Sequence, residues 1–259
     1  MLLQFYKYQG TGNDFIMIDN RQQIFPKNDT KLIERLCDRK FGIGADGLIL
    51  LELSDLHDFT MIYHNADGKV GSMCGNGGRC TVAFAEQLGI IENKTVFDAF
   101  DGLHEASIKD AVVSLKMSDV TSVETFDNHL FLNTGSPHHI TYVDNITKTD
   151  VYGVGKNIRY GAPYFEEGSN VNFVEQQNGN TFKVRTYERG VEDETLSCGT
   201  GVTAVALASH KSNKTKDTTI RLETQGGTLE VSFETDGEGY KNIYLKGEAT
   251  LVFKGQIEI

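Results

Sequence analysis

The chain has 259 residues, of which 39% are hydrophobic and 24% are charged, and its formal net charge is −11 at pH 7. This composition is typical of a globular protein with one large domain or two ordinary ones, and it excludes an intrinsically disordered chain. The acidic balance argues against nucleic acid or an anionic membrane as the main partner, but not against an anionic small molecule, because the field of a pocket depends on its local donors.

The first segment, "MLLQFYKYQG", is expected to form a strand. It lacks the basic-then-apolar layout of a signal peptide, and no apolar run approaches the roughly 18 residues of a membrane span. We therefore expect a cytoplasmic protein without a membrane partner, whose four cysteines are reduced. Further strands are predicted where β-forming residues cluster or alternate with polar ones. These segments are residues 14–19, 47–53, 58–64, 111–117, 170–176, 181–187 and 227–233.

Helical patterns are fewer than strand patterns. Residues 29–40 begin with Asp29, a suitable N-cap, and place their apolar side chains on one face. Residues 78–89 and 201–211 are rich in small apolar residues, which predicts helices that are buried on all sides. A less regular pattern at residues 150–158 is a further candidate.

The two predicted buried helices share a motif, since each follows Cys-Gly-x-Gly. The segments around that motif, "YHNADGKVGSMCGNG" and "YERGVEDETLSCGTG", are also similar. We interpret the chain as two related halves, each with several strands around one central helix. The expected domains are residues 1–117 and residues 118–247, and the last strand, at about residues 248–259, is expected to return to the first half.

Cys74 and Cys198 stand at the start of these two helices, where unpaired N–H groups and the positive end of the helix dipole lie. That position lowers the pKa of a thiol from about 8.5, often by one unit or more. The glycines that follow allow a tight turn, and their amides form a nest suited to a carboxylate. Cys80 points away from Cys74 on the helix and, like Cys37, is expected in the core. No cysteine or histidine spacing matches a zinc site, so no metal is expected.

Two thiols at equivalent helix ends favour a particular chemistry. A nucleophilic mechanism needs one cysteine with a base and an oxyanion hole, and a redox pair usually occupies one motif. A planar intermediate approached from both faces needs two bases, because one thiolate removes a proton from carbon and the opposite thiol returns one. The pattern therefore favours racemisation or epimerisation. No signal of a pyridoxal site accompanies it, so no cofactor is expected.

The ordered set of motifs resembles that of the diaminopimelate epimerase family, cofactor-independent enzymes of lysine and cell-wall synthesis. The motifs are GTGNDF (10–15), NADG (65–68), MCGNGGRC (73–80), SPH (136–138), NVNFV (170–174), YERG (187–190) and SCGTG (197–201). The resemblance implies two similar α/β (α+β) domains, each a mostly antiparallel sheet wrapped around a central helix, with the active site in the interdomain cleft. It also implies epimerisation of LL-2,6-diaminopimelate to meso-diaminopimelate, and a homodimer.

The resemblance further implies roles for single residues. The implied catalytic residues are Cys74 and Cys198 as the two bases, with His138 and Glu188 tuning the protonation of the thiols. The implied amide nest for the reacting carboxylate is Gly75, Asn76, Gly199 and Thr200. The implied ligands of the distal amino-acid end are Asn13, Asn65, Asn170 and Arg189. Two positions depart from the family pattern, since Gly47 stands where glutamine is common and Ser136 where asparagine is common, which predicts a different grip on the distal end.

Two alternatives stay open on the sequence alone. One is a related two-cysteine racemase for another amino acid, such as proline or hydroxyproline. The other is a thiol redox or metal-binding protein without epimerase activity. The motifs YERG and NVNFV favour diaminopimelate over proline, and the absence of metal-ligand spacing argues against the metal-binding alternative.

Overall fold

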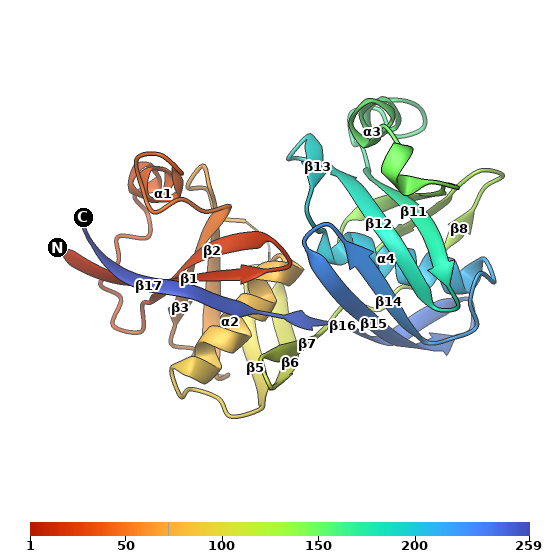
Figure 1. The fold of residues 1–259 in the computed structure, drawn as a ribbon. Coiled ribbons are helices and arrows are strands. Elements are labelled where there is room, and N and C mark those ends of the chain that lie inside the picture. Colours follow the sequence, from red (N-terminus) through yellow and green to blue (C-terminus); the bar gives the residue numbers. More distant parts are fainter. Residues whose placement is uncertain (72) are drawn as a thin grey trace. The chain divides into compact units, whose positions relative to one another are not determined.

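The computed structural model describes residues 1–71 and 73–259, and the chain divides into two compact units. Unit 1 comprises Met1–Leu115 and Gly247–Ile259, and unit 2 comprises Lys116–Lys246. Each unit joins its strands edge to edge and adds two α-helices, so the chain has a two-domain α/β fold (Figure 1). No helix of the described residues is long and apolar enough to cross a membrane.

Unit 1 contains both ends of the chain. Its elements are β1 (Leu2–Gly10), β2 (Asn13–Asp19), α1 (Thr30–Cys37), β3 (Gly47–Glu52), β4 (Phe59–Asn65), α2 (Gly75–Gln87), β5 (Lys94–Ala99), β6 (Gly102–Lys109), β7 (Val112–Lys116) and β17 (Thr250–Glu258). The strands follow one another in space in the order β17-β1-β2-β3-β4-β5-β6-β7. The pairs β2–β3 and β4–β5 are parallel and the other pairs are antiparallel.

Unit 2 is built from the intervening part of the chain. Its elements are β8 (Glu124–Thr125), β9 (Leu130–Asn133), β10 (Pro137–Tyr142), the 3₁₀ turn η1 (Ile146–Lys148), α3 (Val151–Tyr160), β11 (Asn170–Asn178), β12 (Thr181–Glu188), β13 (Asp193–Thr195), α4 (Gly199–Lys211), β14 (Thr219–Thr224), β15 (Gly227–Asp236) and β16 (Gly239–Glu248). The spatial order is β8-β9-β10-β11-β12-β14-β15-β16, with the short β13 beside the end of β12.

The two units repeat one arrangement of strands. From β17 to β7, and again from β8 to β16, neighbouring strands run antiparallel, antiparallel, parallel, antiparallel, parallel, antiparallel and antiparallel. The crossovers also correspond, because α1 and α3 each connect the third and fourth strands of the series, and α2 and α4 each connect the fifth and sixth strands. A parallel pair needs such a crossover, which is why a helix stands at each of these places. The expectation of two similar α/β halves is confirmed.

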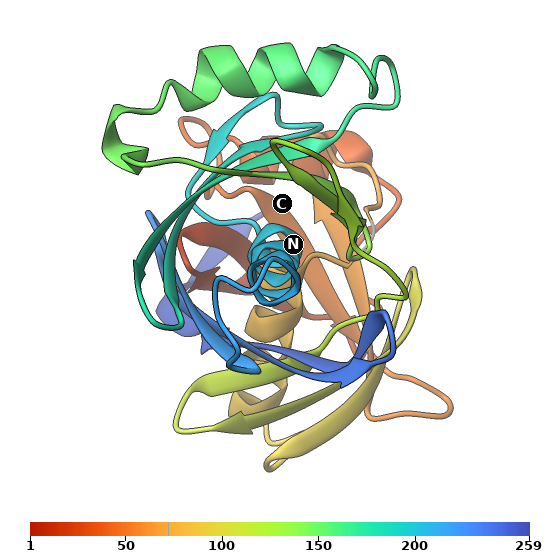
Figure 2. The same cartoon turned by 90° about the vertical axis from the view of Figure 1, so that its right-hand side faces the viewer.

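The helices α2 and α4 occupy the centre of their units. α2 packs against β1, β2, β3, β4 and β6, and α4 packs against β9, β10, β11, β12, β14 and β15. Figure 2 looks nearly along α4, in blue, with strands of unit 2 around it and α3, in green, outside them. Small side chains make this possible, since they let strands approach the helix on every side. Both helices begin directly after their cysteine, at Gly75 and Gly199, a few residues earlier than the apolar pattern predicts.

Candidate active site

Cys74 is the N-cap of α2. Its backbone is extended, with φ −100° and ψ 137°, and its sulfur accepts the N–H of Gly77 at 3.3 Å. The sulfur also lies 3.7 Å from Oδ1 of Asn13. An N–H donor and the positive helix end both stabilise a thiolate more than a thiol. Gly77 allows α2 to lie close to β3, because an added Cβ would lie only 3.1 Å from Cδ1 of Ile49.

The predicted residues Asn13, Gly75 and Asn76 gather around Cys74. Asn13 donates through Nδ2 to Oδ2 of Asp46 at 2.6 Å, which turns its Oδ1 toward Asn76 and the sulfur. Nδ2 of Asn76 lies 3.4 Å from that oxygen. Asp46 therefore fixes the orientation of Asn13, an influence that the sequence motifs did not indicate.

Asn65 lies at the end of a strand of unit 1. It ends β4 and lies opposite Gly47 in the β3–β4 ladder, and its N–H donates to the carbonyl of Lys69 at 2.9 Å. At Gly47, an added Cβ would lie 2.5 Å from Cε2 of Tyr63 and 2.6 Å from the carbonyl oxygen of His64. The ring of Tyr63 thus occupies the place where a longer residue 47 would begin, so this departure from the family pattern has a structural reason.

Arg79, in the first turns of α2, is a functional candidate that sequence reasoning missed. Its side chain is fully buried and donates to the carbonyl of Gly75 at 3.3 Å, to Oδ1 of Asn76 at 3.1 Å and to Oγ1 of Thr11 at 2.9 Å. Within residues 1–71 and 73–259, no carboxylate pairs with it, and its Nε has no hydrogen-bond partner. Burial lowers the pKa of Arg79, whereas the neighbouring thiols of Cys80 and Cys74 raise it. A buried cation without a carboxylate beside Cys74 favours the thiolate there.

Cys198 is the N-cap of α4 and occupies the same place in unit 2 that Cys74 occupies in unit 1. Its backbone is extended, with φ −120° and ψ 114°. Its sulfur lies 3.4 Å from the side-chain oxygen Oγ1 of Thr200. Gly201 is required here, because an added Cβ would lie 3.3 Å from the sulfur of Cys198 and 2.6 Å from Oδ1 of Asn172.

His138 reaches Cys198 through Thr200. Its Nε2 lies 3.0 Å from Oγ1 of Thr200, and its Nδ1 lies 3.1 Å from Nδ2 of Asn172. Burial, with the charge of Arg189 as the smaller cause, lowers the pKa of His138 to about 3. The imidazole is therefore neutral at physiological pH and acts through hydrogen bonds rather than through a charge.

Asn170 and Arg189 lie together at the ends of β11 and β12. Oδ1 of Asn170 accepts the N–H of Arg189 at 2.9 Å, and its Nδ2 donates to Oγ of Ser136 at 2.8 Å. The guanidinium of Arg189 donates to the carbonyl of Glu167 at 2.8 Å. The neighbouring Glu188 accepts the hydroxyl of Thr195 at 2.9 Å. Ser136, the second departure from the family pattern, thus takes part in positioning Asn170.

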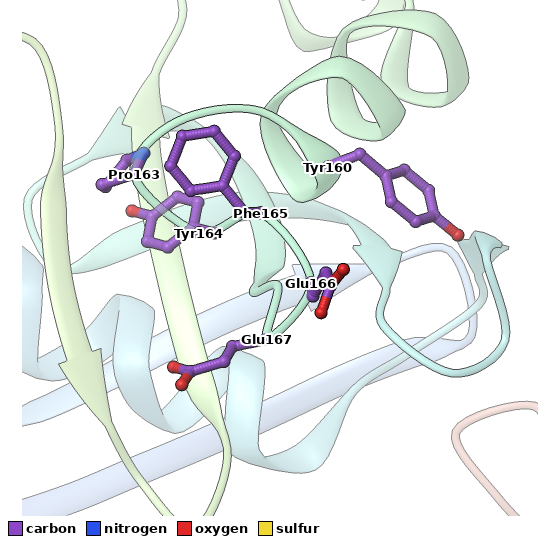
Figure 3. A pocket seen from close by; sticks show the side chains of 6 residues that line it. All are labelled: Tyr160, Pro163, Tyr164, Phe165, Glu166 and Glu167. Carbon is purple, nitrogen blue, oxygen red and sulfur yellow. The ribbon is translucent and has the colours of Figure 1, made fainter.

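An open pocket of about 900 Å³ lies in unit 2 (Figure 3). Its lining residues are Tyr160, Pro163, Tyr164, Phe165, Glu166 and Glu167. None of the predicted site residues lines it. The pocket meets the predicted set only through the backbone of Glu167, which accepts the guanidinium of Arg189.

The remaining cysteines are core residues, as expected. Cys37 and Cys80 are 3% and 0% exposed, and burial raises the pKa of each thiol to about 12. Thiols with such pKa values are inert at neutral pH. Across the described part of the chain, no cluster of three or more histidine, cysteine or carboxylate residues could hold a metal ion.

Comparison with known proteins identifies the family. The sequence profile described as "Diaminopimelate epimerase" matches residues 5–123 and 130–252. A diaminopimelate epimerase of Flavobacterium psychrophilum is 57% identical over 98% of this chain and 100% of its own length. Another, of Chlorobaculum tepidum, is 45% identical over 96% of this chain and 99% of its own length. The chain belongs to the diaminopimelate epimerase family.

Solved structures share the fold of this diaminopimelate epimerase family member. A PhzF-family phenazine biosynthesis protein of Bacillus anthracis matches over 100% of both chains, with a TM-score of 0.79 at 14% identity. A hydroxyproline epimerase of Agrobacterium vitis matches over 99% of this chain and 92% of its own, with a TM-score of 0.69 at 14% identity. At such identities the likeness concerns the fold alone. The family resemblance and the two-domain fold class are both confirmed.

Proposed function

We propose that this family member interconverts LL- and meso-diaminopimelate without a cofactor, with Cys74 and Cys198 as the two bases. One observation supports this above all others: each unit presents a cysteine as the N-cap of its central helix, at equivalent places in the repeated fold. A fold repeated with one acid–base group per copy suits a reaction in which a proton leaves one face of a carbon and arrives at the other.

The proposed step is a proton transfer at the α-carbon. One sulfur, as thiolate, takes the α-proton, and the electron pair of the broken C–H bond is left on a planar carbanion. The opposite sulfur, as thiol, then delivers its proton to the other face. The amides of Gly75, Asn76, Gly199 and Thr200 would hold the α-carboxylate and stabilise the charge that develops on it. Each sulfur must come within about 3–3.5 Å of the carbon.

The distal end of the substrate carries a second ammonium and carboxylate. We assign it to Asn13, Asn65, Asn170 and Arg189. An asparagine side chain can serve both groups, and a guanidinium binds a carboxylate through paired hydrogen bonds. The contacts of Asn170 with Ser136 and Arg189 support a preformed arrangement in unit 2. His138 and Glu188 would act on the protonation of the thiols.

The experiment that tests this function is turnover of LL-diaminopimelate in heavy water. We expect conversion to a mixture of LL and meso forms, with deuterium entering the α-position, because the proton returned comes from a thiol that exchanges with solvent. Proline and trans-4-hydroxyproline serve as matched controls and should take up no α-deuterium. Epimerisation without deuterium uptake, or exchange confined to proline, would contradict the proposal.

Other properties implied by the resemblance stay predictions. A homodimer predicts a sedimentation coefficient for twice the chain mass in analytical ultracentrifugation. Independence from cofactors predicts full activity after treatment with a chelator and with a carbonyl reagent that would trap pyridoxal. A cytoplasmic location predicts activity in the soluble fraction of lysed cells rather than in the medium.

A further inference from the structure

A buried polar chain in unit 2 replaces an apolar cluster in unit 1. The strand registers align the two units, because Phe15 pairs with Gly47 across β2–β3 as His138 pairs with Asn170 across β10–β11. Continuing along the strands, the pair Ile49–Tyr63 of unit 1 corresponds to the pair Asn172–Thr186 of unit 2.

The glycines of the central helices support this alignment independently. An added Cβ at Gly77, three residues after Cys74, would meet Ile49 at 3.1 Å and Phe15 at 3.5 Å. An added Cβ at Gly201, three residues after Cys198, would meet Asn172 at 2.6 Å. We call the strand residues at these aligned positions the layer beneath each cysteine. This layer has the same position in both units, but it is apolar beneath Cys74, with Phe15 and Ile49, and polar beneath Cys198, with His138 and Asn172.

The hydrogen bonds of Asn172 fix the orientation of its amide. Its Oδ1 accepts the hydroxyl of Thr186 at 2.9 Å, and its Nδ2 donates to the carbonyl of His139 at 3.1 Å. The second hydrogen of Nδ2 points at Nδ1 of His138, 3.1 Å away. An amide nitrogen can only donate, so Nδ1 of His138 must be the acceptor.

The proton of the neutral imidazole then lies on Nε2. From there it is donated to Oγ1 of Thr200 at 3.0 Å, which leaves the hydrogen of the Thr200 hydroxyl for its other neighbour, the sulfur of Cys198 at 3.4 Å. One directed chain of donors therefore ends on the sulfur of Cys198. Its members, in order, are Thr186, Asn172, His138 and Thr200. His138, Asn172 and Thr186 are 0%, 0% and 3% exposed, so water does not compete for the bonds among these three side chains, whereas Thr200 is only partly buried.

We propose that Asn172 is a positioning residue that holds His138 in its Nε2–H tautomer, so that the hydroxyl of Thr200 donates its hydrogen to the sulfur of Cys198. A sulfur that accepts this bond is stabilised as thiolate, since hydrogen bonds to a charged group are stronger than those to a neutral one. The inference rests on the proposed function only for the use that catalysis makes of this thiolate.

The link between Thr200 and Cys198 is tested by the alkylation rate of Cys198 against pH, read by mass spectrometry of the peptide that contains it. Thr200→Val keeps the backbone amide and the shape but removes the hydroxyl. We expect the pKa of Cys198 to rise by about one unit, so that alkylation near neutral pH slows about tenfold. Thr200→Ser, the matched control, keeps the hydroxyl and should react like the parent. An unchanged pKa in Thr200→Val would overturn the proposal.

The part played by Asn172 is tested by a double-mutant cycle on the same readout. Asn172→Leu is similar in size but cannot donate, so the preference of His138 for the Nε2–H tautomer is lost. The effect of Thr200→Val on the pKa of Cys198 should then be much smaller than in the parent chain, because the two side chains act in series. Equal effects in the two backgrounds would show that Asn172 does not direct the hydroxyl.

A measurement on the unaltered protein keeps the proposal testable if Asn172→Leu fails to fold. Nitrogen-15 NMR of the histidine rings distinguishes the two tautomers, and we expect Nε2 of His138 to carry the hydrogen at neutral pH. A hydrogen on Nδ1 would refute the proposed direction. None of these measurements requires substrate, so they can fail while diaminopimelate is still epimerised, and they can succeed where it is not.

Discussion

The two units place one cysteine each at the start of a central helix, within the same sequence of parallel and antiparallel strands, yet they surround it differently. In unit 1 the sulfur of Cys74 accepts a backbone N–H, and a buried cation, Arg79, lies in the same helix. In unit 2 the sulfur of Cys198 meets a hydroxyl at the end of a neutral chain through His138. The backbone is repeated, but the means of stabilising a thiolate are not.

This difference suits a reaction with two bases. A reversible epimerase needs one thiol and one thiolate at a time, and the assignment must be able to exchange between them. The positive charge of Arg79 in unit 1 is permanent and stays the same when a sulfur gains or loses its proton. The hydroxyl of Thr200 in unit 2 can rotate, so it can donate to a thiolate or accept from a thiol. The predictions below test whether the asymmetry is real, from the largest expected effect to the smallest.

Removing either sulfur should have the largest effect. Cys74→Ala and Cys198→Ala should each lower the rate of epimerisation by at least the roughly 10²–10⁴-fold that a general base typically contributes. The reason is that the remaining thiol can exchange a proton at only one face of the α-carbon. The rate of conversion of LL-diaminopimelate measures this. Cys37→Ala, a matched change of a core cysteine on α1, should keep its turnover. Near-normal activity in Cys74→Ala or Cys198→Ala would remove that cysteine from the proposed mechanism.

Exchanging the layers beneath the cysteines should have the next largest effect. Ile49→Asn places the residue of unit 2 into the apolar layer of unit 1, where Phe15 stands instead of histidine. We expect β3 to lose about 3 kcal/mol in its opening free energy, because a buried amide finds no partner there and packing is lost. Hydrogen exchange of the β3 amides measures it, with Ile49→Val, at about 1 kcal/mol, as the control. A cost no larger than that of the control would show that unit 1 tolerates polarity as unit 2 does.

The layers also show what the sequence could and could not predict. The buried helices after Cys74 and Cys198 were predictable, because a Cys-Gly-x-Gly motif and a stretch rich in small apolar residues are local signals. Arg79 could have been noticed as a lone cation in an apolar helix. Asn170 and Asn172, two apart on one strand, predict a polar face on β11. Their partners could not be found this way, since the pairing of β10 with β11 joins residues that are far apart in the chain.

Acid should loosen unit 2 at the strand pair that carries His138. The pKa of His138 is lowered to about 3, from a usual value of about 6.5. Between these two pH values the unfolded chain binds a proton at His138 that the folded chain does not bind. The contribution of neutral, buried His138 to the free energy of unfolding is therefore complete above pH 6.5 and is lost progressively as the pH falls below it. At pH 5 the loss is about 2 kcal/mol. His139, whose pKa burial lowers to about 4, adds a loss of the same sign.

Hydrogen exchange of β10 and β11 at pH 7 and pH 5, corrected for intrinsic rates, measures this effect. His138→Phe introduces the residue that stands at the equivalent place in unit 1, and it should remove about half of the pH dependence while leaving the part due to His139, because at pH 5 both folded pKa values lie well below the pH. Equal protection of β10–β11 at the two pH values would argue that His138 is not held neutral by burial. It would also weaken the contrast between the two layers.

The smallest expected effect separates the two ways of stabilising a thiolate. Arg79→Met removes the buried cation, so the pKa of Cys74 should rise by about one unit and its alkylation near neutral pH should slow about tenfold, while Cys198 keeps its rate. Arg79→Lys retains the charge without the three-point contact to Gly75, Asn76 and Thr11. The alkylation rate of Cys74 in this variant should lie between the rates in the parent chain and in Arg79→Met. Mass spectrometry of both cysteine peptides in one sample gives each an internal reference. If both cysteines slowed alike, the substitution would be acting through the fold as a whole, and the charge of Arg79 would not distinguish unit 1 from unit 2.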